Sequence, residues 1–336
     1  MAARLGTPVL GVQGGAYPAA GTWQASFGWR YQKSDKHYIG SEYQVQRTNE
    51  GSEVINHINL ADLSVRYQAS KRVELALGVP YFMGTRSQAL RNASRAIIER
   101  YQTQARGVGD AFFTARRWML DTDKHPGGNL LFGLGVKIPT GENNVVDTFR
   151  VFSATPLPNG TITNAIRTVD QSIQPGDGGF GILADLSAFK SLAKGRFSLY
   201  LNGAYLANPG GTSGVQTYRS ATGEEVMSIA DQYSLRAGAA VAVPGMSSLS
   251  FSAGVRFEGV PVRDLIGPSE GFRRPGYAVA IEPAISYVRG KSTISLGVPF
   301  AVYRNRLVSV ADEANGTHGD AAFADYLILV GYSRRF

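Results

Sequence analysis

Residues 324–336 read ADYLILVGYSRRF and decide the fold class. Counted back from Phe336, alternate residues form a nearly uninterrupted apolar face, with aromatic side chains near both ends, whereas the intervening residues are mixed. A period of two indicates a β-strand, and an apolar face flanked by aromatic residues is typical of a strand that crosses a membrane within a barrel. The apolar face contains Ala322, Ala324, Tyr326, Ile328, Val330, Tyr332 and Phe336, interrupted by Arg334.

The same alternation recurs upstream, beginning with TWQASFGWRYQ at residues 22–32. Its expected outward set alternates with polar residues and glycine. Counting matches to the period-two pattern gives twelve strands, an even number. The outward set of the first strand is Trp23, Ala25, Phe27, Trp29 and Tyr31, and the other expected strands cover residues 59–69, 73–83, 109–119, 129–139, 178–189, 195–207, 232–243, 249–260, 276–288, 292–303 and the C-terminal segment.

The connections alternate strictly between long and short along the chain. Short ones such as SKR, KSLAKG and RGK are rich in turn formers and charge. Outer-membrane barrels have long extracellular loops and short periplasmic turns, and an even strand number places both termini in the periplasm. A soluble propeller or a pair of sandwiches is the alternative, but neither requires all long loops on one side. The long connections cover roughly residues 33–57, 84–107, 140–177, 208–231, 260–275 and 304–320.

Composition excludes several function classes. The chain has 336 residues and no cysteine, which excludes disulfides, thiolate catalysis and Cys-ligated metals. No stretch approaches the ~18 consecutive apolar residues of a membrane helix, so only a barrel would cross a bilayer. The net charge of +8 is scattered without a basic helix, which argues against nucleic-acid binding. The first fifteen residues lack the apolar core of a secretory signal, so we interpret the numbering as a mature chain behind an added Met.

Short glycine-rich motifs in the fourth to sixth strands carry a family resemblance. Gly107, Gly109 and Asp110 enter one strand, whereas Pro139, Thr140 and Gly141 leave the next. With PGDGGFG and VRFEGVPVRDLIG, these motifs resemble the outer-membrane transporter-like family associated with the meta-cleavage pathway of phenol degradation. The resemblance implies a porin-like channel that passes aromatic or other apolar compounds, without catalytic residues.

Strand direction and parity predict a charged cluster at the outer rim. Asp110 and Lys137 should face each other, joined by Asp177 at the top of the sixth strand. They form either a charged constriction that screens solutes or a rim salt bridge. The inward-facing charges are balanced, which argues against strong ion selectivity. They are Arg30, Arg66, Arg116, Lys137, Arg236, Arg256 and Arg335 against Asp62, Glu74, Asp110, Asp185, Glu258, Glu282 and Asp325.

The expected lumen also contains more apolar surface than a water-filled pore requires, which indicates either a path for hydrophobic solutes or a packed segment. Twelve strands leave both outcomes open. We divide the chain into a leader, residues 1–21, and a barrel, residues 22–336. The leader is either a periplasmic tail or a plug, and residues 143–174 offer a second segment that would fold inward. The apolar lumen residues are Phe82, Phe112, Trp118, Leu131, Leu183, Phe189, Tyr200, Leu206, Leu327 and Leu329, and the apolar plug contacts would be Val9, Leu10 and Val12.

An outer-membrane hydrolase is the enzyme alternative. It needs a base beside a nucleophile, but the four histidines lie in or beside loops and turns, where solvated side chains are the simplest interpretation. Loop carboxylates lack the spacing of a calcium loop, so no metal or cofactor is expected. The histidines are His37, His57, His125 and His318, and the loop carboxylates are Glu142, Asp147 and Asp170.

A structural or docking barrel, whose lumen or loops bind a partner protein, is a further alternative. Residues 84–107 are basic, would lie near lipopolysaccharide phosphates, and contain SQALRNASRAIIERYQ, a candidate amphipathic helix. Our leading expectation is passive or facilitated diffusion of small apolar or aromatic compounds across the bacterial outer membrane. The expected partners are the lipid bilayer, lipopolysaccharide, the solute, and the barrel assembly machinery through the strand ending at Phe336, which resembles its C-terminal recognition signal.

Overall fold

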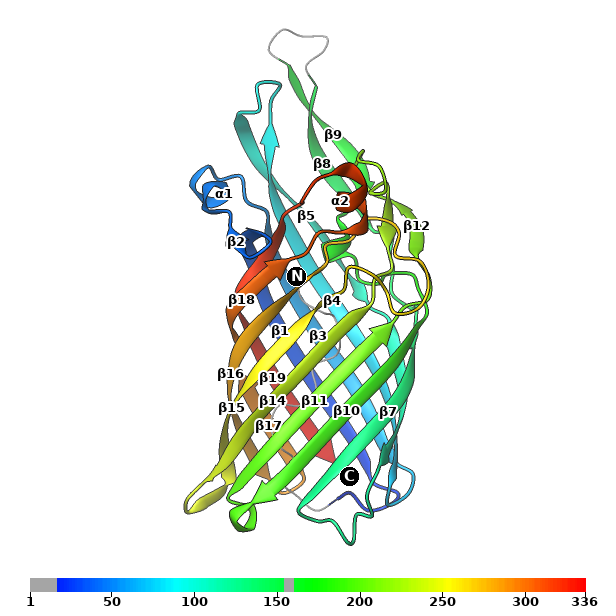
Figure 1. The fold of residues 1–336 in the computed structure, drawn as a ribbon, viewed down its shortest axis with the longest axis vertical. Helices are drawn as coiled ribbons and strands as arrows, with labels where there is room; N and C mark the ends of the chain where they lie inside the picture. Colours follow the sequence, from blue (N-terminus) through cyan, green and yellow to red (C-terminus); the bar gives the residue numbers. More distant parts are fainter. Residues whose placement is uncertain (1–16, 154–159) are drawn as a thin grey trace.

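The chain forms a closed antiparallel β-barrel in its computed structural model, which describes residues 17–153 and 160–336 (Figure 1). Twelve strands build the wall in this part of the chain, which confirms the predicted fold class. The wall strands are β1 (Trp23–Ile39), β3 (Ile55–Gln68), β4 (Val73–Arg91), β5 with β6 (Ile97–Val108 and Ala111–Trp118), β7 (Gly128–Ile138), β10 (Gly181–Leu192), β11 (Phe197–Ala207), β14 (Gln232–Val243), β15 (Met246–Val260), β16 (Gly276–Arg289), β17 with β18 (Ser292–Gly297 and Phe300–Arg306) and β19 (Ala321–Arg335).

The C-terminal strand closes the barrel by pairing with the first strand. The β1–β19 register runs from Gln24 opposite Arg335 to Tyr38 opposite Ala321. Beyond the ladder, the Phe336 amide donates to the Trp23 carbonyl oxygen at 2.8 Å. Closure removes the open sheet edges that lipid could not satisfy, which explains why the alternating pattern continues to the end of the described chain.

The outer surface is apolar and bears aromatic rings toward both ends. On β3, Leu63 is 60% exposed, as expected for a lipid-facing position. Rings on four consecutive wall strands form a row toward one end of the barrel, with centroids 5.2–5.9 Å apart. The Trp23 and Tyr67 rings lie toward the opposite end, 4.6 Å apart. The ring row contains Tyr233, Phe257, Tyr277 and Tyr303.

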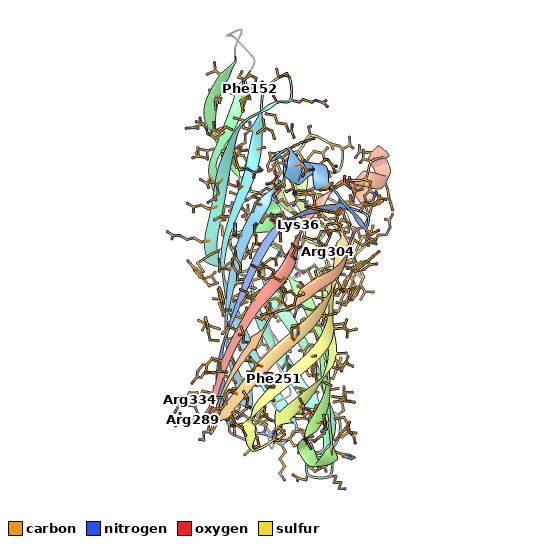
Figure 2. The ribbon with its side chains drawn as sticks, turned by 90° about the vertical axis from the view of Figure 1, so that its left-hand side faces the viewer. Lys36, Phe152, Phe251, Arg289, Arg304 and Arg334 are labelled. Atoms are coloured by element: carbon orange, nitrogen blue, oxygen red, sulfur yellow. The ribbon has the colours of Figure 1, made fainter. Side chains whose placement is uncertain are left out.

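Two wall strands are interrupted, one between β5 and β6 and the other between β17 and β18. The second of these is the strand predicted as residues 292–303. Pro299, which has no backbone N–H, lies just before β18. Above this break β18 and β19 share a single residue pair, Phe300 opposite Tyr326. Arg304, labelled in Figure 2, bridges the two strands by an ion pair of 2.7 Å to Asp325. The Asp325 side chain is 51% exposed, so its assignment to the lumen is wrong.

The long connections gather at one end of the barrel, which we call the loop end, and the short turns at the other, the turn end, where the C-terminus lies (Figure 1). The loop-end elements are β2 (Glu42–Tyr43), α1 (Val45–Asn49), β8 (Val146–Ser153), β9 (Thr161–Thr168), η1 (Gln171–Ile173), β12 (Thr212–Gln216), β13 (Val226–Ser228) and α2 (Val310–Asn315), whereas η2 (Ala193–Gly195) forms part of a short turn.

Residues 84–107 were expected to be a loop with a short helix, and this is wrong. β4 and β5 continue beyond the barrel as a twisted hairpin that projects from the loop end (Figure 1). Alternating side chains still pair across the hairpin there, which stabilises strands instead of a helix. In the described part of the chain, no helix has the length and apolar character needed to cross a membrane.

Candidate functional site: a cavity at the loop end

Glycines from the three predicted motifs meet at one point in the wall. An added Cβ at Gly141 would lie 2.8 Å from the Gly176 Cα and 2.9 Å from the Gly109 carbonyl carbon. Real Cβ atoms do not approach backbone this closely, so only glycine allows the three segments to touch. The Thr140 hydroxyl reinforces the contact by donating to the Gly109 carbonyl oxygen at 2.8 Å. The motifs therefore fix the segment after Gly141 against the barrel wall.

The rim cluster, Asp110, Lys137 and Asp177, lies beside these glycines. The Lys137 ammonium pairs with the Asp177 carboxylate at 2.5 Å from Oδ1 and lies 4.0 Å from Asp110. The Asp110 carboxylate accepts from the Gly141 amide at 3.0 Å and the Asp177 amide at 3.2 Å. Lys137 is 1% exposed, so its charge depends on these partners. The cluster thus couples the wall to the segment around Asp177.

The expectation that residues 143–174 fold inward is wrong for β8 and β9, which pair as a hairpin that projects from the loop end. In the described part of this segment, it holds only near Gln171 and Ser172, which line the cavity.

Loop residues 170–178, 211–231 and 261–275, which we call the lid, contribute side chains to a cavity in the lumen at the loop end. Asp170 is the central residue of the lid, because its carboxylate accepts from the Ser172 amide at 3.0 Å and from the Tyr218 hydroxyl at 3.0 Å. Arg274 binds both carboxylate oxygens, at 2.9 and 2.7 Å, and Arg86 approaches to 3.5 Å. Burial alone would raise the pKa of Asp170, but Arg274 and Arg86 hold it well below its usual range.

Further contacts join the lid segments to one another. The Arg273 guanidinium is fully buried, pairs with Asp264 at 2.6 Å and donates to the Ser228 hydroxyl at 2.7 Å. The Gln171 side-chain amide donates to the Ser228 carbonyl oxygen. Moving one lid segment away would leave a buried charge without its partner, which is costly. These contacts therefore hold the lid segments in one arrangement.

The cavity bordered by the lid has a volume of about 260 Å³. Its lining combines apolar side chains with the rim cluster and with lid residues. Part of the apolar lining belongs to a buried group in which Ile173 of the lid packs among residues from β3, β4 and β5. A concave site that combines apolar side chains with charged and polar groups is suited to binding a small molecule. The apolar lining residues include Ile58, Leu60, Phe82, Phe112, Leu206 and Val260.

An ion-pair ladder of five charged residues lies in the lumen below the cavity. Arg30 of β1 reaches Glu258 of β15 at 2.7 Å, which links strands that are not neighbours in the wall. Arg256 pairs with Glu258 at 2.6 Å and with Glu282 at 3.3 Å. Arg236 completes the ladder at Glu282, to which its Nε donates at 2.9 Å. All five are 5% exposed or less, and Arg30 also lines the cavity, so one end of the ladder reaches the cavity.

A second group of lumen charges lies on the opposite wall. Arg116 pairs with Glu74 at 3.4 Å and with Asp185 at 3.1 Å. The pair with Asp185 passes over β7 at Gly133, where an added Cβ would lie 2.5 Å from the carboxylate. All ten predicted site residues therefore fall into three groups: the rim cluster, the ladder, and the Arg116–Asp185 pair.

The lid residues are what sequence reasoning missed. Asp170 was considered only as a weak calcium ligand, yet it binds arginines, and the described residues contain no group of three or more metal-ligating side chains. His37 was expected to be solvated, but it is 3% exposed and contacts Asp320 at 2.9 Å. Its Nε2 accepts from the Val54 amide at 2.8 Å and is therefore not free to act as a base.

The leader contributes one described aromatic side chain. The Tyr17 ring packs edge-on against Trp118, with centroids 5.0 Å apart, and lies 6.0 Å from Phe189. Its hydroxyl donates to the His125 carbonyl oxygen in a short turn. This places Tyr17 at the turn end of the barrel, whereas Val9, Leu10 and Val12, the predicted plug contacts, lie outside the described residues.

No protein-family model and no curated protein sequence matches this chain. Among solved structures, the COG4313 outer membrane channel from Pseudomonas putida F1 is similar over 98% of this chain and all of that chain, with a TM-score of 0.60 and 13% identity. The transport unit of the autotransporter AIDA-I from Escherichia coli aligns over 100% and 95% of the two chains, with a TM-score of 0.48 and 11% identity. The P. putida toluene transporter TodX aligns over 95% and 91%, with a TM-score of 0.47 and 10% identity. The likeness to the P. putida F1 channel extends over the whole barrel and shows the fold.

Proposed function

We propose that this protein is a bacterial outer-membrane channel for passive or facilitated diffusion of small apolar or aromatic compounds. The observation that carries the proposal is the cavity, which places apolar side chains such as Ile58, Leu60 and Phe82 inside a closed barrel with a lipid-compatible exterior. The outer-membrane channel of similar fold supports the location and the transport class. The loop end would face outward, near lipopolysaccharide, and the turn end the periplasm.

Three finer points belong to the same proposal. The glycine motifs support a place in the family associated with phenol degradation, and hence an aromatic solute. The C-terminal strand ending at Phe336 would be presented to the barrel assembly machinery. The leader would act as a plug at the turn end, supported by the packing of Tyr17 on Trp118.

A docking barrel is the second candidate. The β8–β9 hairpin projects from the loop end, where Ile166 is 68% exposed and Ile162 is 36% exposed. Exposed apolar side chains on a projecting hairpin are suited to contact with another protein. On this view the lid would be permanent and the lumen would carry no solute.

Single-channel conductance in a planar bilayer separates these functions, using the full chain and a variant that lacks residues 1–20. Discrete steps in the full chain support an open diffusion path. Steps that appear only after truncation support the channel and identify the leader as its plug. Silence in both proteins contradicts an ion-conducting path and favours the docking barrel or a carrier restricted to uncharged solutes.

A further inference from the structure

The cavity presents more positive than negative charge to its contents. Seven lysine and arginine side chains line it, against three aspartates. The lining has this excess of positive charge because several carboxylates that pair with its arginines do not themselves line the cavity. Asp170, Glu224 and Asp264 pair with lining arginines but are not among the described residues that line the cavity. The basic lining residues are Arg30, Arg47, Arg86, Lys137, Arg219, Arg273 and Arg274, and the acidic ones are Asp110, Asp177 and Asp320.

Arg219 has unused hydrogen-bonding capacity. Its Nη1 donates to Glu224 at 3.0 Å, and its guanidinium stacks on the Phe272 ring at 3.9 Å. Its Nε is buried and has no hydrogen-bond partner. A buried donor without an acceptor is costly, so an anionic ligand that supplied one would be stabilised there.

Arg86 is bound chiefly by neutral groups. Its Nε and Nη1 donate over 3.3 Å to Gln88 and Asn56, and the nearest carboxylate, Asp170, is 3.5 Å away and is bound more closely by Arg274. A guanidinium with long bonds to neutral partners gains most from a carboxylate, which it binds with two parallel hydrogen bonds.

The cavity offers an apolar surface for a ring on the same face of β4 as Arg86. Phe82 lies on the same face of β4, four residues toward the turn end, and is 1% exposed. Gly84, between them, would carry a Cβ only 2.6 Å from the Phe82 ring, so the absence of that atom lets the ring lie along the strand toward Arg86. Ile58 and Leu60 of the neighbouring strand also line the cavity. The charged and apolar parts of the site are therefore adjacent.

We propose that the cavity is a binding site for a small aromatic monocarboxylate, whose carboxylate contacts Arg86 and Arg219 and whose ring lies against Phe82, Ile58 and Leu60. The inference rests on the proposed channel function and names one solute class for it. A volume of about 260 Å³ lies just below the usual range of ligand pockets and favours a single ring over a long acyl chain. An inorganic anion would leave the apolar wall unused, and a neutral ring would leave the guanidinium groups unused.

Isothermal titration calorimetry of the detergent-solubilised full chain tests this with benzoate, benzamide, acetate and inorganic phosphate. Benzamide keeps the ring and shape of benzoate without its charge. We expect benzoate to bind at least about tenfold more tightly than the other three, as expected for a ligand that uses both a charged hydrogen bond and an apolar wall. Equal binding of benzamide and benzoate, or equal binding of acetate or phosphate, would overturn the proposal.

Two variants and a control assign the effect to residues. R86Q and R219Q should each weaken benzoate binding about tenfold or more and weaken benzamide binding by a smaller factor. R263Q is the control, because Arg263 is 64% exposed and pairs with Glu313 outside the cavity. Unchanged benzoate binding in both variants would refute the assignment. R219K keeps the positive charge but lacks the planar guanidinium group. A benzoate affinity of R219K between those of the wild type and R219Q therefore excludes simple loss of folding.

Measuring the passage of phenol and benzoate into vesicles that contain the protein distinguishes failure of the proposed carboxylate site from failure of the proposed channel function. Passage of phenol without saturable benzoate binding would refute the carboxylate site and leave the channel function intact. Passage of neither compound would refute the channel function itself. Phenol passage that benzoate inhibits competitively in the wild type, but not in R219Q, is the result that supports both.

Discussion

Asp170→Asn should release the lid. The substitution keeps the size of the side chain but removes the charge that faces Arg274 at 2.7 Å and Arg86 at 3.5 Å. Asp170 is 2% exposed, so both arginines would lose their closest buried counter-ion. Breaking a buried pair by removing one partner costs about 3–5 kcal/mol. Since about 1.4 kcal/mol is a factor of ten, the closed lid should become at least about a hundredfold less favoured over its open state.

Hydrogen exchange followed by mass spectrometry measures this directly. Amides in residues 170–178 and 217–231 should exchange at least about a hundredfold faster in Asp170→Asn, whereas the wall strands keep wild-type rates. Asp123→Asn is the matched control, because Asp123 and Lys71 form an exposed pair in the short turns and such pairs contribute little. Lid exchange within about threefold of the wild type would refute the reasoning that Asp170 holds the lid closed.

Three further predictions follow from the wall and loop contacts. Gly133→Val should separate Arg116 from Asp185, because a Cβ at Gly133 would lie 2.5 Å from the Asp185 carboxylate. Gly127→Val is the control, because a Cβ at Gly127 would have no atom within 4 Å. The denaturation temperature of Gly133→Val should therefore be lower than that of Gly127→Val. Burial alone would raise the pKa of Asp320, but the hydrogen bond from His37 and the charge of Arg47, 3.0 Å away, lower it to about 2. These contacts therefore stabilise the loops fully above pH ~4 and are lost as the pH falls through ~2; protease resistance of residues 307–320 that disappears already at pH 5 would contradict this. Deletion of Phe336, whose amide closes the ladder, should lower the yield of folded, heat-resistant barrel in cells.

Parity along the strands predicted the wall and much of the lumen. The alternation is local, so it correctly placed Leu63 on the outside and Asp110 beside Lys137. It failed where side chains leave that geometry: Asp325 turns outward where β18 separates from β19. Loop residues follow no period, so the sequence offered no sign that Asp170 would meet Arg274, 104 residues later.

Charge balance was a weaker guide than position. Counting inward-facing residues gave equal numbers of both signs, and most of the counted side chains do form pairs in the ladder or in the Arg116 group. The cavity, however, is lined partly by loop arginines that were not counted, including Arg219 and Arg274, and their counter-ions lie behind them. The sign of a cavity surface thus depends on which member of each pair faces inward, which a sequence does not specify.

The central claim is that small aromatic molecules pass through the cavity. The most direct test measures how fast phenol reaches an oxidising enzyme entrapped in vesicles whose outer leaflet contains lipopolysaccharide. Ile58→Trp fills the cavity, whereas Leu63→Trp places the same ring on the lipid face of the same strand. We predict fast uptake with the wild type and Leu63→Trp, and slow uptake with Ile58→Trp. Equal uptake with and without the protein would contradict the claim.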